Sequence, residues 1–513
     1  MTNLSPSNDQ VNAVIELFSS GHFEKVLEAI SLLSKDYPNE SLLHNIKGAS
    51  YAGLGQFDAA IESYREAIVI DPNYYKAFFN LGGVFEETGE LDKAIINYEK
   101  SLIIEPAYAE AHNNLGNVYR QLGQFDKAVN CLNEALIIKP DYIEALYSLG
   151  SVYQELGQLT EAVKCYEAVL KEKPDFAEMH NNLGVLLQEL GQPKKAIKYL
   201  NQALIIMPEF KEAHNNLGNV LKGQGNSNEA ISSYQKALSI DSSYVEAHNN
   251  LGSVFYSLGR LEEAVEYYKK GLAIEPNDTE GQYNLGLVLQ SLGQFGHAIL
   301  CYEKALKINP DYADAHNNLG ISFKEIGKLD EAIESYEKAI SINPQYAEAH
   351  NNIANVFMEL GQSEMALKSY RKAIEVNPEY AEAHNNLGII LMSLGQLNEA
   401  VNCYKKAIRV NTNYESAYVN LGIVFNLQGQ LNNAHEYYQK ALTINPNMPE
   451  VFSNLGNLMI DLKKIKEAAI NYEKAYTLKP EDYYSLGNLL HTKMHLCNWN
   501  NISDLQKIGR AHV

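Results

Sequence analysis

The chain has 513 residues, of which 46% are hydrophobic and 20% charged, and its formal net charge at pH 7 is −21. It has enough apolar side chains to form a core, but no run of 18 or more apolar residues of the kind that spans a membrane. The excess of acidic residues is spread evenly, which argues against nucleic acid as a ligand, because nucleic-acid binding needs a basic surface.

The N-terminal stretch has neither a basic segment nor an apolar segment of the kind that forms a secretion signal. We therefore expect a cytoplasmic chain in which residues 1–8 are an N-terminal tail. No linker, charge block or hinge rich in Pro or Ser interrupts the residues that follow, so one extended array is expected over residues 9–482.

A period of 34 residues runs through residues 9–482, and such a period indicates a repeat architecture. Glycine recurs in phase at Gly21, Gly55, Gly89, Gly123, Gly157, Gly191, Gly225, Gly259, Gly293, Gly327, Gly361, Gly395 and Gly429. Proline recurs in phase at Pro38, Pro72, Pro106, Pro140, Pro174, Pro208, Pro276, Pro310, Pro344, Pro378, Pro446 and Pro480.

The unit at residues 109–142 predicts two antiparallel helices. Leu115, Val118 and Leu122 have the i, i+3, i+7 spacing of one apolar helix face. Gly123 breaks the first helix, and Pro140 ends the second, because proline disfavours helical backbone in the residue before it. A lone pair would expose an apolar face, so the pairs are expected to stack into a solenoid.

Small residues are expected where the two helices of a pair approach closely, as at Gly116 and Ala128. A large side chain stands four residues after the alanine, for example Tyr166, and we expect it to fill the gap to the next pair.

This unit resembles the tetratricopeptide repeat. The residues that carry the resemblance are Leu115, Gly116, Tyr119, Ala128, Ala135 and Pro140, with tyrosine at the twenty-fourth position of other units, as in Tyr98 and Tyr166. The resemblance implies an all-α, right-handed superhelical solenoid of about 14 helix pairs, whose first helices line a concave groove.

An asparagine recurs at the sixth position of the unit, and we take it as a candidate peptide-binding residue. An amide both donates and accepts, so it can hold the backbone of an extended chain without reading side chains. The alternative is that each asparagine bonds to the neighbouring repeat and only fixes the stacking. The candidate residues are Asn80, Asn114, Asn182, Asn216, Asn250, Asn284, Asn318, Asn352, Asn386, Asn420 and Asn454.

Eight histidines recur at the fourth position, but we interpret them as spacers and not as metal ligands. Residues one repeat apart lie on the order of 10 Å from each other, too far to share one metal ion. The same spacing excludes disulfides between the in-phase Cys131, Cys165, Cys301 and Cys403. No phosphate loop, nucleophile elbow or HExxH motif is present, so we predict no catalytic residue, metal site or cofactor in this chain.

The period changes after Pro480, where Leu486-Gly487 stands three residues ahead of the expected Leu-Gly pair. Together with Cys497-Asn498-Trp499, this junction resembles that of the O-linked N-acetylglucosamine transferases, in which a shortened repeat leads into a glycosyltransferase domain. Residues 483–507 are therefore expected to be a transition helix and linker. Residues 508–513 resemble translated sequencing adapter, so they are expected to be a non-native tail, with the native part of this sequence stopping near Lys507.

The resemblance implies the substrate-recruiting array of a protein O-glycosyltransferase, without the catalytic domain. The alternative is a stand-alone scaffold that assembles protein complexes. Either function predicts extended or unfolded segments of other proteins as partners in the groove, with neither nucleic acid nor membrane as a partner. A homodimer through the convex face remains open.

Overall fold

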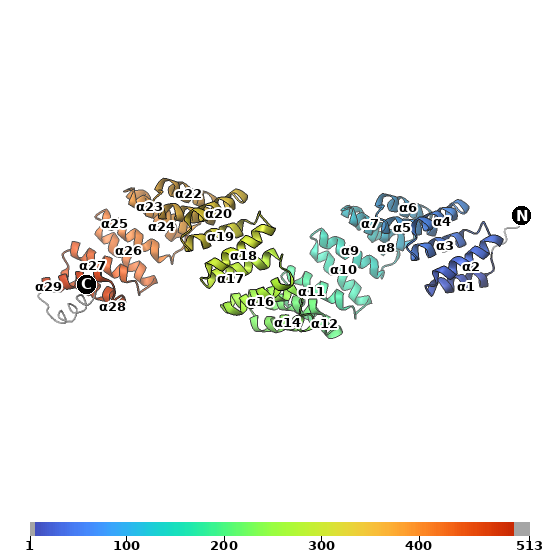
Figure 1. The fold of residues 1–513 in the computed structure, drawn as a ribbon, viewed down its shortest axis with the longest axis horizontal. Coiled ribbons are helices and arrows are strands. Elements are labelled where there is room, and N and C mark those ends of the chain that lie inside the picture. The colour runs from blue at the N-terminus through green and yellow to red at the C-terminus, as the bar shows by residue number, and fades with distance from the viewer. Residues whose placement is uncertain (1–5, 497–513) are drawn as a thin grey trace. The chain divides into compact units, whose positions relative to one another are not determined.

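The computed structural model describes residues 6–496, which form helices joined by short turns, with no strand in that range. The chain divides into two compact units, Met1–Val254 and Phe255–Val513. Within each unit, helix pairs stack one after another along the chain (Figure 1). The predicted all-α solenoid of helix pairs is therefore confirmed.

The first helix of each pair carries an odd number in Figure 1. These helices are α1 (Asn8–Ser19), α3 (Ser41–Gly53), α5 (Tyr75–Glu87), α7 (Ala109–Gln121), α9 (Ile143–Glu155), α11 (Ala177–Glu189), α13 (Lys211–Gly223), α15 (Val245–Ser257), α17 (Thr279–Ser291), α19 (Ala313–Glu325), α21 (Ala347–Glu359), α23 (Ala381–Ser393), α25 (Glu415–Leu427), α27 (Pro449–Asp461) and α29 (Tyr483–His495).

The second helices carry even numbers. They are α2 (Phe23–Asp36), α4 (Phe57–Ile70), α6 (Leu91–Ile104), α8 (Phe125–Ile138), α10 (Leu159–Glu172), α12 (Pro193–Ile206), α14 (Ser227–Ile240), α16 (Leu261–Ile274), α18 (Phe295–Ile308), α20 (Leu329–Ile342), α22 (Ser363–Val376), α24 (Leu397–Val410), α26 (Leu431–Ile444) and α28 (Ile465–Leu478).

The turn between the two helices of a pair requires the recurring glycine. After α7, the Gly123 N–H donates to the carbonyl of Arg120, and Gly123 takes a φ of 69°. This left-handed backbone costs other residues energy because their Cβ atom crowds the following carbonyl. The predicted break between the two helices of a pair is confirmed.

Each pair closes around the contact between the glycine at the eighth position and the large residue of the second helix. A Cβ atom on Gly150 would lie 2.4 Å from a ring carbon of Tyr166, which is only 2% exposed. The ring can approach this closely because glycine has no side chain. The ring lies on the glycine of its own pair and belongs to the same buried cluster as Met179 and Leu183 of the next pair. That the tyrosine fills the gap to the next pair stays a prediction.

One face of the stack is formed by the first helices. Successive first helices contact one another, as α7 does with α9 and α19 with α21, whereas successive second helices show no comparable contact in the part of the chain that the structure describes. Because the first helices lie closer together, their side of each unit is the concave side.

The last described helix, α29, keeps the 34-residue spacing, since it begins at Tyr483 and α27 begins at Pro449. Leu489 takes the place of the leucine of the Leu-Gly pair and is 1% exposed, while nothing lies near Gly487. The interpretation of Leu486-Gly487 as an early Leu-Gly pair is therefore wrong. Cys497-Asn498-Trp499 and residues 508–513 lie outside the described residues.

Candidate peptide-binding face

The eleven candidate asparagines all lie on the concave side, each as the sixth residue of its first helix and each half-buried. We call the surface that they form, together with the residues three and six positions later on the same helices, the ladder face. It is described separately for the two units, with Asn80 to Asn250 in the first and Asn284 to Asn454 in the second.

Most of these amides donate a hydrogen bond to the preceding pair. The acceptor is the Oδ1 atom of the asparagine at the fifth position of the preceding first helix. The six bonds of this kind run from Asn80 to Asn45 (3.0 Å), Asn216 to Asn181 (2.9 Å), Asn250 to Asn215 (2.9 Å), Asn352 to Asn317 (3.1 Å), Asn386 to Asn351 (3.3 Å) and Asn420 to Asn385 (3.0 Å).

Other residues replace this bond where the pattern changes. Asn114 and Asn318 donate to the hydroxyls of Tyr98 and Tyr283, at 3.4 and 2.9 Å. At the fifth position of α7, the Oδ1 atom of Asn113 is buried without a partner, because Ser148 takes the place of the asparagine that would donate to it.

These bonds support the alternative that the asparagines fix the stacking of the repeats. They engage the Nδ2 atoms of six amides, and they leave the peptide-binding role of the eleven residues as a prediction. Asn182, Asn284 and Asn454 donate no such bond within residues 6–496, so stacking does not account for every residue of the series.

In some units an asparagine also stands three positions after the ladder asparagine, and it holds a tyrosine hydroxyl from the second helix. Tyr234 donates to Asn219 at 2.8 Å, and Tyr472 donates to Asn457 at 2.6 Å. Burial raises the pKa of Tyr472 to about 12, so its hydroxyl keeps its proton at neutral pH. Because apolar residues such as Ile321, Ile389 and Ile423 take this position in other units, the ladder face alternates between amide and apolar side chains here and carries no charge at this position.

Two hollows open on the ladder face of the second unit. One of about 320 Å³ is lined by Lys324, Asn355, Met358, Glu359, Tyr370, Asn386 and Ile389. The other, of about 370 Å³, is lined by Asn457, Ile460, Asp461, Tyr472, Asn488, His491 and Thr492. Each combines amide groups with one or two apolar side chains, as a site for single side chains of an extended peptide requires.

Asn488 is a residue of this face that the sequence interpretation missed. It is the sixth residue of α29, and its Nδ2 atom is buried without a hydrogen-bond partner. Its spacing of 34 residues from Asn454 is the signal that identifies it, and the mistaken alignment of Leu486-Gly487 concealed it. An unpaired buried donor that lines a hollow is available to a ligand carbonyl.

The family model described as the cilia and flagella-associated protein 70 C-terminal domain, a tetratricopeptide-repeat model, matches residues 40–248 and 277–485, more than half of the chain. The chain belongs to this family. A second model, described as a TPR repeat, matches residues 252–293 of this tetratricopeptide-repeat chain. No curated protein matches it significantly.

Solved structures resemble parts of the tetratricopeptide-repeat array. The APC/C hetero-tetramer Cut9–Hcn1 is 14% identical over 87% of this chain and 95% of that chain, with a TM-score of 0.43. MamA is 31% identical over 32% of this chain and 97% of that chain, with a TM-score of 0.31. PilF of Pseudomonas aeruginosa is 22% identical over 41% of this chain and 95% of that chain, with a TM-score of 0.38. At these TM-scores the likenesses support no argument on function.

The histidines at the fourth position of the tetratricopeptide units are hydrogen-bond donors and not mere spacers. In eight units, the Nε2 atom lies 2.9–3.2 Å from the carbonyl oxygen of the residue six positions earlier, which is proline in all but one. Because a carbonyl only accepts, Nε2 carries the proton. Each histidine thus ties its helix to the turn that ends the preceding pair.

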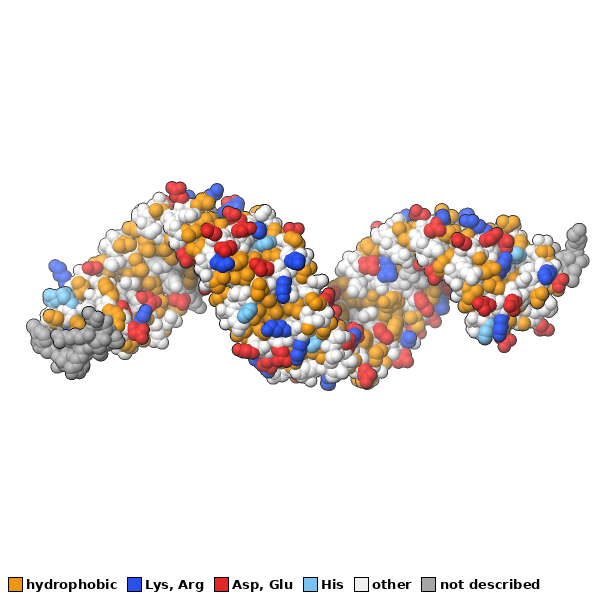
Figure 2. Space-filling model, in the orientation of Figure 1, with side chains coloured by type: hydrophobic (Ala, Val, Ile, Leu, Met, Phe, Trp, Pro, Cys, Tyr) orange, Lys and Arg blue, Asp and Glu red, His pale blue; other side chains and the backbone are white. Residues whose placement is uncertain are grey.

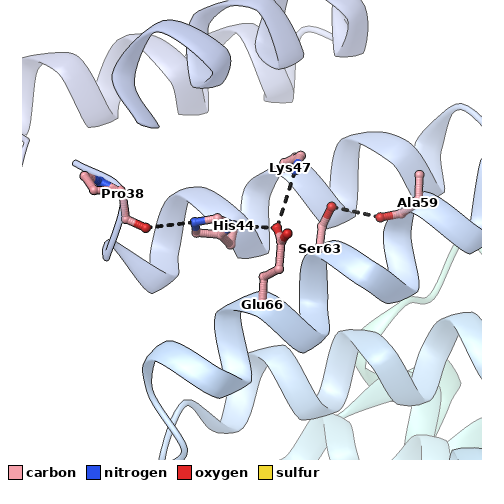
Figure 3. A network of polar contacts seen from close by, with 6 residues as sticks. All are labelled: Pro38, His44, Lys47, Ala59, Ser63 and Glu66. Atoms are coloured by element: carbon pink, nitrogen blue, oxygen red, sulfur yellow. Dashed lines mark hydrogen bonds and ion pairs between the residues drawn. The ribbon is translucent and has the colours of Figure 1, made fainter. Parts of the chain in front are cut away.

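Figure 3 shows the first of these histidines, His44, between the carbonyl of Pro38 and the carboxylate of Glu66. Lys47 contacts the same carboxylate at 3.4 Å, while Ser63 donates to the carbonyl of Ala59 within α4. The partners of Glu66 lower its pKa against the opposing effect of burial. This network joins α3 to α4 and serves the packing of the pair.

The described tetratricopeptide units offer neither a metal site nor a membrane-spanning helix. Residues 6–496 contain no group of three histidine, cysteine or acidic residues placed to hold a metal ion. Cys131, Cys165, Cys301 and Cys403 are free thiols, and burial raises the pKa of each. No described helix is both long and apolar enough to cross a membrane.

Proposed function

We propose that this chain is a protein-interaction scaffold that binds extended segments of partner proteins along its ladder face. The observation that carries the proposal is the hollow between α27 and α29, where the buried Nδ2 donor of Asn488 has no partner and Asn454 makes no bond to the preceding pair. A peptide carbonyl in this hollow would satisfy the donor.

The chemistry of the face favours the peptide backbone over particular side chains. The Oδ1 atoms of Asn114, Asn182 and Asn386 already accept a bond from the preceding asparagine. By contrast, the stacking bonds of Asn352 and Asn420 use their Nδ2 atoms and leave their Oδ1 atoms to accept peptide N–H donors. Because each such bond contributes about 0.5–1.5 kcal/mol, binding is expected to depend on several asparagines together and to tolerate many sequences.

A matched pair of variants separates binding from stacking. The double change Asn454→Ala and Asn488→Ala removes amides that make no stacking bond, so we expect peptide affinity to fall about tenfold with little change in melting temperature. The double change Asn352→Ala and Asn420→Ala also leaves the Oδ1 atoms of Asn317 and Asn385 unpaired, so the melting temperature should fall clearly as well.

The measurement uses arrayed 15-residue peptides of unrelated neutral sequence, with fluorescence anisotropy for affinity and circular dichroism for melting. Wild-type affinity for many unrelated peptides is the expected starting point. If the Asn454 and Asn488 variant binds as the wild type does, or if only melting responds in either variant, the ladder face is a stacking device and the proposal fails.

A finer proposal is that the array recruits acceptor proteins to a glycosyltransferase domain that follows it. Its support is the resemblance of Cys497-Asn498-Trp499 and of the asparagine series to the O-linked N-acetylglucosamine transferases. The competing function is a stand-alone scaffold. Reading the gene beyond codon 507 distinguishes them, because several hundred further in-frame codons favour recruitment and an immediate native stop codon excludes it.

A further inference from the structure

The second unit also carries a groove on the side opposite to the ladder face. It lies between the second helices α16 and α18, with α17 as its floor, and has a volume of about 930 Å³. That volume lies in the range of pockets that hold drug-sized ligands. In Figure 2 hydrophobic side chains gather over these helices, with basic side chains between them.

Small residues open the groove at this point of the array. Ala273 stands on α16 at the repeat position where three second helices of the first unit carry Ile103, Ile137 and Ile205, and where the neighbouring second helices carry Ser239 and Lys307. Each of these isoleucines projects from the surface with more than 70% of its side chain exposed. An alanine in their place leaves the wall of the groove low.

The interior of the groove is apolar. Leu272, Leu285 and Leu289 form buried parts of its wall and floor, and Leu300 on α18 is 54% exposed at its edge. Covering an exposed leucine removes apolar surface from water, which contributes about 25 cal/mol per Å². The groove therefore offers an apolar contact to a ligand that can cover Leu300.

The rim of the groove is basic, in a chain whose net charge is −21. Lys269, Lys304, Lys307 and His297 line it, and no acidic residue does. None of the three lysines forms an ion pair within residues 6–496. Their charges are therefore available to a partner.

The neighbouring helices show that this charge pattern is local. The first turn of α18 has no acidic residue, whereas α16 begins with Glu262 and Glu263 and α20 with Asp330 and Glu331. Along α18, His297 and Leu300 occupy the repeat positions that Glu331 and Glu334 occupy along α20. A basic, apolar groove thus stands between acidic surfaces.

We propose that the groove between α16 and α18 binds an acidic amphipathic helix of a partner protein. The apolar face of such a helix would lie on Leu285, Leu289 and Leu300, and its carboxylates would pair with Lys269, Lys304 and Lys307. This is helix-in-groove recognition on a face separate from the ladder face, and it does not depend on the function proposed for that face.

The test uses the whole chain and two fluorescein-labelled helical peptides with leucines at i, i+3, i+4 and i+7. The remaining positions are glutamate and alanine in one peptide, and lysine and alanine in the other. We expect fluorescence anisotropy to show saturable binding of the glutamate peptide alone, weakened by added salt as charge pairing requires.

Two variants locate the site. The triple change Lys269→Glu, Lys304→Glu and Lys307→Glu is expected to lower the affinity for the glutamate peptide at least tenfold. The matched control carries Lys368→Glu, Lys466→Glu and Lys479→Glu, three exposed lysines on or beside other second helices of the same unit, and is expected to bind within twofold of the wild type. Ala273→Trp, which fills the groove without changing its charge, should also weaken binding at least tenfold.

The proposal is overturned if both peptides bind equally, or if the groove and control lysine variants lose the same affinity. Sedimentation of the chain without peptide examines a second copy as the occupant. Self-association that Ala273→Trp abolishes would assign the groove to a homodimer and would also overturn the proposal. Circular dichroism confirms that each variant remains folded.

Discussion

Four of the fourth-position histidines are hydrogen-bond donors whose protonation opposes folding. Burial lowers the pKa of His214, His316, His350 and His384, and it outweighs the carbonyl bond, which raises the pKa. A nearby lysine, such as Lys236 beside His214, lowers it further. His44 differs, since its second ring nitrogen, Nδ1, lies 2.9 Å from a carboxylate oxygen of Glu66.

Stability should therefore fall as the pH drops below about 6.5, the ordinary pKa of histidine in an unfolded chain. In that window the unfolded chain binds protons that the folded chain does not, so the contribution present above pH 6.5 is lost as the pH falls through the lowered folded-state pKa. Melting followed from pH 7.5 to pH 5.0 measures the effect.

Replacing His214, His316, His350 and His384 by glutamine should reduce the dependence of the melting temperature on pH. Gln282 already stands at the fourth position of α17, and its Nε2 atom donates to the carbonyl of Pro276 at 3.3 Å without titrating in this range. Replacing the exposed His22 and His297 by glutamine is the control and should leave the slope unchanged. An unaltered slope in the fourfold variant would rule these histidines out as its source.

The turn inside each helix pair restricts which residues can occupy it, because one of its residues adopts a left-handed backbone conformation. Thirteen glycines adopt positive φ in the turns inside the pairs, and Lys463 takes a φ of 60° in the equivalent turn between α27 and α28. A left-handed conformation costs a residue with a Cβ atom about 1–2 kcal/mol. The last described pair therefore carries strain that the other pairs avoid.

Lys463→Gly is expected to stabilise this pair by about 0.5–1 kcal/mol, after subtraction of the larger backbone entropy that glycine has when unfolded. Lys466→Gly, the same change within the first turn of α28, should cost up to about 1 kcal/mol. Hydrogen exchange of peptides from α27 and α28 reports both effects. A destabilised Lys463→Gly variant would show that the lysine side chain contributes more than its backbone costs.

Across the whole molecule, the sequence predicts what repeats and misses what depends on contacts between repeats. Gly123 and Pro140 place the ends of α7 and α8 because their backbone restrictions are local. The bond from Asn352 to Asn317 joins two pairs, and a periodic sequence cannot indicate in which direction an amide turns. The sequence did not predict the groove at Ala273, because a single small residue opens a groove only where the side chains packed around it leave the space unfilled.

Because contacts join neighbouring pairs only, damage to one pair should remain local. A Cβ atom on Gly82 would lie 2.8 Å from the ring of Tyr98, whereas one on Gly83 would meet nothing closer than 3.7 Å. Gly82→Ala should therefore cost about 1–3 kcal/mol, and not more, since the fully buried Ala354 occupies the same repeat position in α21. Gly83→Ala should stabilise α5 by up to about 1 kcal/mol.

Hydrogen exchange measured for individual peptides tests both the size of the stability loss and how far it extends along the array. In Gly82→Ala, protection should fall in α3 to α8, which hold the damaged pair and its neighbours, and should stay unchanged in α11 to α14 of the same unit. Gly83→Ala, one residue away in the same helix, is the matched control and should not lower protection anywhere. If Gly82→Ala lowered protection equally from α3 to α14, the first unit would unfold as one cooperative block, and nearest-neighbour coupling would not describe the array.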